Sequence, residues 1–325
     1  MTRSSRWRPS MTEPWLSVIM PVHDGGMWLT ETLASVHAQD APGIEVILLD
    51  SSDSDACERI AASFSGKLDL QYQRRTDLKS WTVKTNAGVM SARARHVAML
   101  HQDDVWLPGR AAALKHAILT TPEAVLTLFP TQIIDAAGAR LGSWRCPLPA
   151  RRDLSAGQVA ERLLIQNFVA VPAPLIRRDA WLAAGGMDEA LWYTGDWDLY
   201  LKLARQGIVR YEPVETTAFR IHPNSLTVSG SRDRSAFVEQ MVQVVDRHID
   251  LIPPARRESV LRCASASVRV NDSLAAAARG ERGALREGLR ALLRLNPIEM
   301  LRYWYNARLG ERVLPRVRAK FAGSF

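Results

Sequence analysis

The stretch LSVIMPVHDGGMWLTETLASVHAQDAPGIEVILLD, residues 16–50, contains two apolar runs separated by a segment with helical spacing. The runs at 16–22 and 44–50 are rich in valine and isoleucine, which favours β-strands. Between them, apolar residues recur at helical spacing over 27–39, which predicts an amphipathic helix. A helix between two strands is typical of parallel pairing, so we expect a mostly parallel α/β sheet with helices on its faces.

The same alternation of strands and helices continues to about residue 130. Serine and aspartate residues in SSDSD (51–55) are expected to cap a helix after the second strand. No GxGxxG motif follows the first strand, which removes the main support for a dinucleotide-dependent dehydrogenase. Further along, DWDLYLKLARQG (196–207) predicts a helix closed by a glycine cap. The remaining expected elements are strands at 68–73, 96–100 and 124–130 and helices at 82–94 and 109–121.

Length and composition are those of an ordinary globular protein. The 325 residues, 47% hydrophobic and 23% charged, fit one large domain or two smaller ones. Cys57, Cys146 and Cys263 form no CxxC pair, which argues against a disulfide framework or a thiolate zinc site and favours a cytoplasmic setting. No run of about 18 apolar residues predicts a membrane-spanning helix. Residues 1–15 have no apolar segment behind their arginines, so we expect a flexible tail there and no secretory signal.

The net charge of +8 is concentrated at one end of the chain. Residues 231–325 hold 18 Arg and Lys against 10 Asp and Glu, whereas residues 1–230 are balanced. This region is expected to be helical, and over 282–294 it predicts a basic amphipathic helix that could contact an anionic membrane. The alternative is a helix packed on the domain with a solvated arginine face. The helix combines two neighbouring faces, Arg282, Arg286, Arg290 and Arg294 on one and Leu285, Leu289, Leu292 and Leu293 on the other.

Polar clusters follow three of the expected strands. They are PVHDGG, LDSSDSD and HQDD, and in a parallel sheet all three would face one crevice at the carboxyl ends of the strands. Asp103 and Asp104 lie in the third cluster, where adjacent carboxylates repel each other unless a cation or water offsets their charge. Taken alone, this pair could equally be the cap of the helix that follows.

In their order and spacing, these motifs resemble the inverting nucleotide-sugar glycosyltransferases of family 2, which have the GT-A fold with a Rossmann-like, mostly parallel central sheet. The resemblance extends from about residue 16 to about residue 227. It rests on SVIMPVHDGG with LASVHAQ, EVILLDSSDSD, KTNAG, HQDDVW, GGMDEAL, GDWDLYLKLA and FRIHPNSLT.

The resemblance implies a role for each matching residue. Asp103 would hold a divalent cation, Mg²⁺ or Mn²⁺, with His222 completing the metal site in the manner of some members. Asp196 would be the catalytic base, and Asp198, roughly 200° further around a helix, could not face the same pocket. The residues expected at the nucleotide sugar are Pro21, His23, Asp24, Asp50, Ser51, Lys84, Asn86, His101, Gln102 and Asp104.

The sequence departs from the family pattern at four positions. Ser51 stands for the second acid after the second strand, Thr85 for an arginine, His101 for the first aspartate of the metal motif, and Gly195 for a glutamate. The cation ligand and the base are kept, so the resemblance implies an active, metal-dependent enzyme. The alternative is a catalytically impaired nucleotide-sugar-binding protein of the same fold.

The implied enzyme would move a sugar from a UDP-, GDP- or dTDP-linked donor to a glycan or lipid-linked acceptor in bacterial surface polysaccharide or glycolipid synthesis. Its expected parts are a tail (1–15), a GT-A domain (16–230) and a helical basic C-terminal region (231–325). Within the domain, 16–130 would bind the donor and 131–230 the acceptor. We expect a cytoplasmic protein, peripheral on the inner face of the membrane, and no nucleic-acid partner because no recognised module is present.

Overall fold

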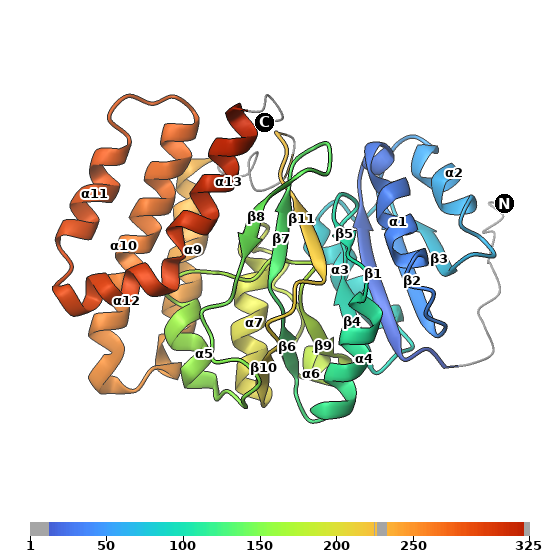
Figure 1. Cartoon of the computed structure of the whole chain (residues 1–325), viewed down its shortest axis with the longest axis horizontal. Coiled ribbons are helices and arrows are strands. Elements are labelled where there is room, and N and C mark those ends of the chain that lie inside the picture. Colours follow the sequence, from blue (N-terminus) through green and yellow to red (C-terminus); the bar gives the residue numbers. More distant parts are fainter. Residues whose placement is uncertain (1–12, 224, 226–232, 322–325) are drawn as a thin grey trace.

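In the computed structural model, which describes residues 13–223, 225 and 233–321, seven strands form one central sheet (Figure 1). The expected tail at 1–15 lies largely outside the described residues. In spatial order the strands are β10 (Val209–Tyr211), β6 (Leu126–Leu128), β9 (Leu175–Arg177), β4 (His96–Met99), β1 (Leu16–Val22), β2 (Ile44–Asp50) and β3 (Asp69–Arg74).

The sheet is mostly parallel, as the sequence predicts. Strand β1 pairs in parallel with both β2 and β4, β2 pairs with β3, and β10 pairs with β6, whereas β9 runs antiparallel to β4 and β6. Every residue of β1 and β2 is buried, which is typical of strands covered on both faces. Along β1, Val18 and Met20 pack in one hydrophobic cluster and Ile19 in another, so the two clusters lie on opposite faces of the sheet.

A second, smaller sheet stands beside the first. Its four strands, in spatial order, are β5 (Val105–Trp106), β11 (Thr217–Arg220), β7 (Thr131–Ile134) and β8 (Arg140–Trp144). Because β5 pairs with β11 directly after the HQDD segment, residues more than 100 positions apart in the chain meet at this point.

Seven α-helices flank the strands over residues 13–223, and the bounds of α1, α3, α4 and α7 lie close to the predicted ones. They are α1 (Leu29–His37), α2 (Ala56–Ala62), α3 (Trp81–Ser91), α4 (Arg110–Thr120), α5 (Ala156–Leu163), α6 (Arg178–Ala183) and α7 (Gly195–Gln206). A 3₁₀ turn, η1 (Gly25–Met27), takes the place of the first residues of the helix predicted at 27–39.

One predicted cap is wrong, and the other is confirmed in its position but not in a left-handed conformation. Asp55 precedes α2, but its side chain accepts no capping hydrogen bond and instead pairs with Arg59 one turn on, at 2.5 Å. Gly207 ends α7 with φ 166°, which is extended backbone rather than a left-handed cap. A β-carbon there would lie 2.9 Å from Val125, so close packing on the neighbouring loop accounts for this glycine.

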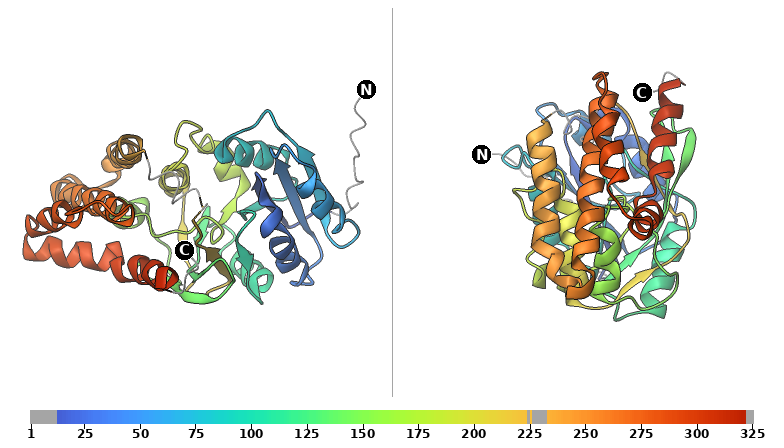
Figure 2. Two further views of the ribbon diagram at one scale, coloured as in Figure 1. Left: turned by 90° about the horizontal axis from the view of Figure 1, so that it is seen from above. Right: turned by 90° about the vertical axis from the view of Figure 1, so that its left-hand side faces the viewer.

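The C-terminal region is helical, as predicted, and forms a bundle at the end of the molecule opposite β1–β3 (Figures 1 and 2). In this bundle α10 packs against α9, α11 and α12, while α13 crosses to β8. No helix in the described part of the chain is long and apolar enough to cross a bilayer. The bundle consists of α9 (Arg234–His248), η2 (Ile249–Leu251), α10 (Pro254–Ala278), α11 (Leu285–Leu293), α12 (Pro297–Ala307) and α13 (Leu309–Phe321).

Candidate active site

The three polar loops predicted to share a crevice do meet at the carboxyl ends of β1, β2 and β4. Val22 lies opposite Asp50 in the sheet register, so the loops after β1 and β2 leave side by side. The His23 ring lies against the second loop, with Nδ1 3.3 Å from the Ser51 carbonyl oxygen. The Gln102 amide joins the third loop to the first, because its Oε1 accepts from the His23 N–H at 2.7 Å and its Nε2 donates to the His23 carbonyl at 2.8 Å.

Four side chains gather at the end of β4 and the end of β11. His101, Asp103 and Asp104 each offer one ligand atom within 4.8 Å of the others. His222 Nε2 lies 2.9 Å from Asp103 Oδ2, although 119 positions separate the two residues. The predicted cation ligand and the predicted late histidine are therefore in direct contact.

Arg220 organises this cluster, and the sequence reasoning did not single it out. Its side chain is fully buried, its Nε donates to the Asp103 carbonyl at 2.8 Å, and its main-chain N–H donates to Asp104 Oδ1 at 3.0 Å. Its Nη2 also pairs with Glu31 of α1 at 2.7 Å. The only signal in the sequence is its place in FRIHP, two residues before His222.

The electrostatics of the cluster suit a divalent cation. Burial, and then the neighbouring Asp103 carboxylate, raise the pKa of Asp104 well above its usual range. Burial lowers the pKa of His101, which leaves its ring neutral near pH 7 and able to bind a metal through nitrogen. Three buried atoms of this cluster have no hydrogen-bond partner among the described residues, namely His101 Nε2, Asp104 Oδ2 and His222 Nδ1. Carboxylate oxygens and imidazole nitrogens together fit Mn²⁺, and carboxylates with water fit Mg²⁺.

Asp50 and Lys84 are buried on the other side of the crevice. Asp50 Oδ1 accepts from Ser52 Oγ at 2.5 Å and its Oδ2 accepts from the Tyr72 hydroxyl at 2.9 Å. Lys84 Nζ donates to Ser51 Oγ at 2.8 Å and to the last carbonyl of β1. Burial lowers the pKa of Lys84 to about 8, although the nearby Asp50 opposes the shift. Lys84 thus holds the ends of β1 and β2 together, whereas Asp50 fixes the loop that follows it and bonds to β3. The contact of either side chain with a nucleotide stays a prediction.

Pro21 and Asp24 lie on either side of His23. Pro21 is the next-to-last residue of β1, and Asp24 has a left-handed backbone with φ 50° and an exposed carboxylate. The Asp24 N–H is held by Ser52 Oγ at 2.8 Å, which fixes the loop while the carboxylate remains in solvent.

Asn86 is directed to a loop from the second half of the domain. Its Oδ1 accepts from the Met187 N–H at 2.9 Å, and its Nδ2 donates to the Met187 carbonyl at 2.9 Å and to Glu189 at 3.1 Å. Gly186 of the same loop has φ 70°, and a β-carbon there would lie 2.8 Å from Asn86 Oδ1. Asn86 therefore positions the GGMDE loop, and its contact with a nucleotide likewise stays a prediction.

Asp196 lies in the first turn of α7 and is buried. Asn167 Nδ2 donates to Asp196 Oδ2 at 3.1 Å. Burial raises the pKa of Asp196 to about 6, and the hydrogen bond from Asn167 opposes that shift. Trp81 lies between the start of α7 and the cation cluster. The ring centroids of Trp81 and His101 are 5.3 Å apart, and a β-carbon on Gly195 would lie 3.8 Å from Trp81 Cζ2.

The close approach at Gly195 accounts for the missing glutamate. A β-carbon there would lie 2.9 Å from Thr82 Cγ2 of α3, a distance that leaves no room for a larger side chain. Asp198 faces away from the crevice, as its position around the helix predicts. Its carboxylate is bound by Lys202 at 2.7 Å and by His248 of α9 at 2.9 Å.

Comparison with known proteins agrees with this geometry. Residues 17–167 match the family model described as glycosyl transferase family 2. The matched range contains the three crevice loops, the Asp103 and Asp104 pair and Asn167. Over these residues the chain is similar to glycosyltransferase family 2. It is therefore an enzyme of the transferase class, which confirms the family predicted from the ordered motifs.

Similar curated proteins include an uncharacterized glycosyltransferase of Rickettsia prowazekii, 25% identical over 230 residues, with 68% of each chain covered. Among solved structures, S. aureus TarS in complex with UDP-GlcNAc aligns with a TM-score of 0.64 at 16% identity, covering 95% of this chain and 92% of that one. Of a longer TarS chain, 55% is covered. The mannosyltransferase PcManGT from Pyrobaculum calidifontis, in complex with GDP-Man and Mn²⁺, aligns with a TM-score of 0.57 at 15% identity, covering 98% and 87%. These structures confirm the GT-A fold.

Proposed function

We propose that this glycosyltransferase is metal-dependent and inverts the anomeric centre of the sugar it transfers. The observation that carries the proposal is the meeting of Asp103 and His222 at 2.9 Å beside His101 and Asp104. Such a group of ligands, opposite a buried carboxylate at Asp196, suits the transfer of a sugar from a diphosphate leaving group.

Asp103 and His222 would hold the cation, with Asp104 and His101 beside them. When bound, a divalent cation neutralises the negative charge that develops on the diphosphate oxygens as the anomeric bond breaks. Arg220 keeps the ligands in place, because it binds the backbone of Asp103 and the carboxylate of Asp104 at once. The Mn²⁺ named with PcManGT supports this assignment, and the choice between Mg²⁺ and Mn²⁺ stays open.

Asp196 would accept the proton of the attacking acceptor hydroxyl. With a pKa of about 6 it is ionised at pH 7 yet basic enough to take a proton. General-base assistance of this kind is typically worth about 10² to 10⁴ in rate. If the hydroxyl attacks from the side opposite the leaving diphosphate, the anomeric configuration inverts.

The structural neighbours support the proposed donor, and the family resemblance supports the proposed acceptor. UDP-GlcNAc with TarS and GDP-Man with PcManGT support a UDP-, GDP- or dTDP-linked sugar as donor. The proposed acceptor is a hydroxyl of a glycan or a lipid-linked saccharide in bacterial surface polysaccharide or glycolipid synthesis. The proposed location is the cytoplasm, at the inner face of the membrane.

The second candidate is a nucleotide-sugar-binding protein with impaired catalysis. It is favoured by the imidazole of His101 at a position where family members have a carboxylate, and by the tight packing that excludes a glutamate at Gly195. The two candidates differ in turnover and agree on donor binding.

One experiment separates them. The full chain is incubated with UDP-, GDP- and dTDP-sugars, with and without Mn²⁺, and both thermal shift and released nucleotide are measured. We expect a Mn²⁺-dependent shift and nucleotide release in the wild type, loss of both in Asp103→Asn, and loss of release alone in Asp196→Asn. Asp246→Asn, at an exposed carboxylate of α9, is the matched control. A full Mn²⁺-dependent shift in Asp103→Asn would refute the metal assignment, and binding without release in the wild type would favour the second candidate.

A further inference from the structure

Helix α11 turns three of its four leucines away from the protein, while Leu292 packs inward against the core. It packs on α10 through Gly288 and Ala291, and a β-carbon on Gly288 would lie 3.1 Å from Ser273 of that helix. Three leucines repeat every four residues on the other side, and each is more than half exposed: Leu285, Leu289 and Leu293. An ordinary surface helix buries its leucines and exposes its small or polar residues, so the polarity of α11 is inverted.

Helix α12 also turns large apolar side chains outward. Its buried side carries Tyr303 and Ala307 together with the polar residues Glu299 and Asn306, and Glu299 pairs with Arg262 of α10 at 2.6 Å. Its other side carries four apolar or aromatic side chains that are each more than half exposed: Ile298, Leu301, Trp304 and Tyr305. We call these four residues and the three leucines of α11 the outer face. Helices α11 and α12 lie at the end of the molecule remote from β1–β3 (Figure 1).

Arginines border the outer face. Each of the three exposed leucines of α11 is followed by an exposed arginine, namely Arg286, Arg290 and Arg294, and Arg282 precedes the helix. Arg290 pairs with Glu287, whereas Arg282, Arg286 and Arg294 form no ion pair within the described residues. Residues 231–325 also carry the whole net charge of +8. The outer face thus combines exposed apolar groups, aromatic groups and unneutralised positive charge.

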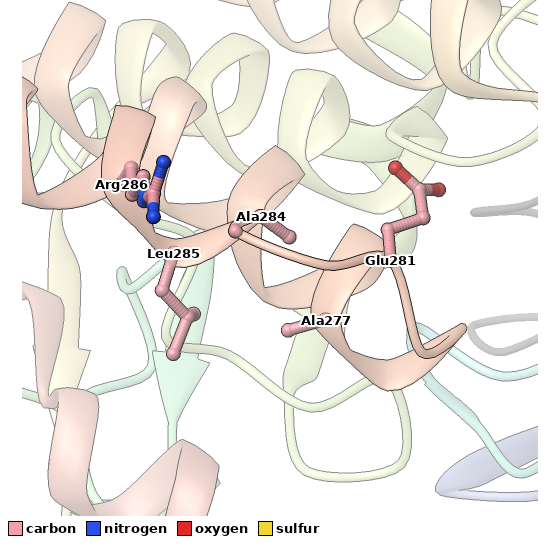
Figure 3. A pocket seen from close by; sticks show the side chains of 6 residues that line it. Ala277, Glu281, Ala284, Leu285 and Arg286 are labelled. Atoms are coloured by element: carbon pink, nitrogen blue, oxygen red, sulfur yellow. The ribbon is translucent and has the colours of Figure 1, made fainter.

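A hollow of about 230 Å³ opens at the start of α11 (Figure 3). Ala277, Ala284 and Leu285 contribute apolar lining, while Glu281 and Arg286 stand at its two ends. It lies in the bundle, away from the cation cluster, so it is no candidate for the donor site. The hollow lies beside Leu285, the first leucine of the outer face.

We propose that the outer face docks on the surface of an anionic lipid bilayer. Leucine, tryptophan and tyrosine side chains would enter the headgroup region, and the bordering arginines would meet the lipid phosphates. A second copy of the chain fits less well, because two outer faces packed together would bring their arginine borders into mutual repulsion. This proposal adds a docking surface to the proposed function. It rests on that function only for the idea that the membrane presents a lipid-linked acceptor.

The test is co-sedimentation of the full chain with vesicles of phosphatidylcholine, with and without phosphatidylglycerol, in the absence of donor and acceptor. We expect binding only when phosphatidylglycerol is present. Leu289→Gln with Leu301→Gln should lower the partition coefficient about tenfold or more, since each removes a large inserted apolar group. Arg286→Gln with Arg294→Gln should lower it about tenfold, and added salt should weaken wild-type binding.

Two exposed residues elsewhere serve as matched controls, and neither substitution should change vesicle binding: Leu119→Gln on α4 and Arg152→Gln. The proposal would be overturned if both double variants partitioned onto vesicles as the wild type does. It would also be overturned if the wild type bound uncharged vesicles as well as anionic ones. So would a leucine variant that loses a dimer in solution while keeping vesicle binding, because the outer face would then bind a second copy. Nucleotide release by the same variants is measured in parallel, so that a failure of the docking surface is distinguished from a failure of the enzymatic assignment.

Discussion

Replacing Asp196 by asparagine is expected to stabilise the protein while removing its activity. The Asp196 carboxylate is 7% exposed, and burial raises its pKa from 3.8 to about 6. A shift of this size, about two units, corresponds to roughly 3 kcal/mol of folding free energy lost when the group is ionised. Asparagine has nearly the same shape and carries no charge, and its oxygen can still accept from Asn167 Nδ2.

The sign of the effect depends on pH. Below about pH 4 Asp196 is protonated in both the folded and the unfolded chain, so its ionisation costs nothing. Between about pH 4 and pH 6 the unfolded chain releases the proton first, which favours unfolding of the wild type. Above the folded pKa of about 6 both states are ionised and the full penalty is present. The stabilisation of Asp196→Asn should therefore grow from pH 4 to pH 6 and remain constant at higher pH.

The assay is urea denaturation of wild type and Asp196→Asn at several pH values, together with nucleotide release at pH 7. We expect a gain of roughly 2 to 3 kcal/mol in the free energy of unfolding at pH 7.5 and little gain at pH 4. Activity should fall about 10² to 10⁴-fold. Asp246→Asn, at an exposed carboxylate, should show neither change. A variant that is less stable than wild type at pH 7.5, or equally stabilised at all pH values, would refute the reasoning about the buried carboxylate.

Three further substitutions test the packing and the metal site. Gly195→Ala should destabilise the protein by about 1 to 3 kcal/mol in urea denaturation, because its β-carbon would meet Thr82 at 2.9 Å, whereas Gly310→Ala has open space and should cost little. Arg220→Lys should lower the free energy of unfolding by about 2 to 4 kcal/mol and weaken Mn²⁺ binding, since lysine cannot make all its contacts, and unchanged stability would contradict this. His222→Ala should raise the Mn²⁺ concentration for half-maximal thermal shift about tenfold or more, and an unchanged midpoint would remove this residue from the ligands.

Much of the fold follows from local patterns. The apolar runs at 16–22 and 44–50 became β1 and β2 with the predicted bounds, because runs of branched apolar residues suit strands buried on both faces. The placement of polar loops at the ends of these strands also followed, since parallel strands direct their carboxyl ends to one edge. The predicted cap at Asp55 failed, because its carboxylate pairs with Arg59 instead. Gly207 does end α7, but in an extended conformation packed on Val125.

Some residues of the site can likewise be recognised from the sequence, and others only from the tertiary structure. The pair Asp103 and Asp104 is visible in the sequence as adjacent acids after a strand, and the family pattern points to Asp196. Arg220 is not visible as a site residue, since nothing in its neighbourhood shows that β11 will pair with β5 beside the acids. The structural task of Asn86 was hidden for the same reason, because the loop it holds lies about 100 positions away.

By itself, the sequence determined the kinds of element, the carboxylates available for chemistry and the charge of the C-terminal region. The tertiary structure decided which distant residues meet, such as Asp103 with His222, and which side of α11 faces outward. The periodicity of α11 shows a leucine side and an arginine side but not which of them is buried. That choice was made by Gly288 and Ala291, whose small size allows close approach to α10 and leaves Leu285, Leu289 and Leu293 at the surface. The spacing of residues along a helix shows which of them share a side. Which side is buried depends on the element that long-range packing places against the helix.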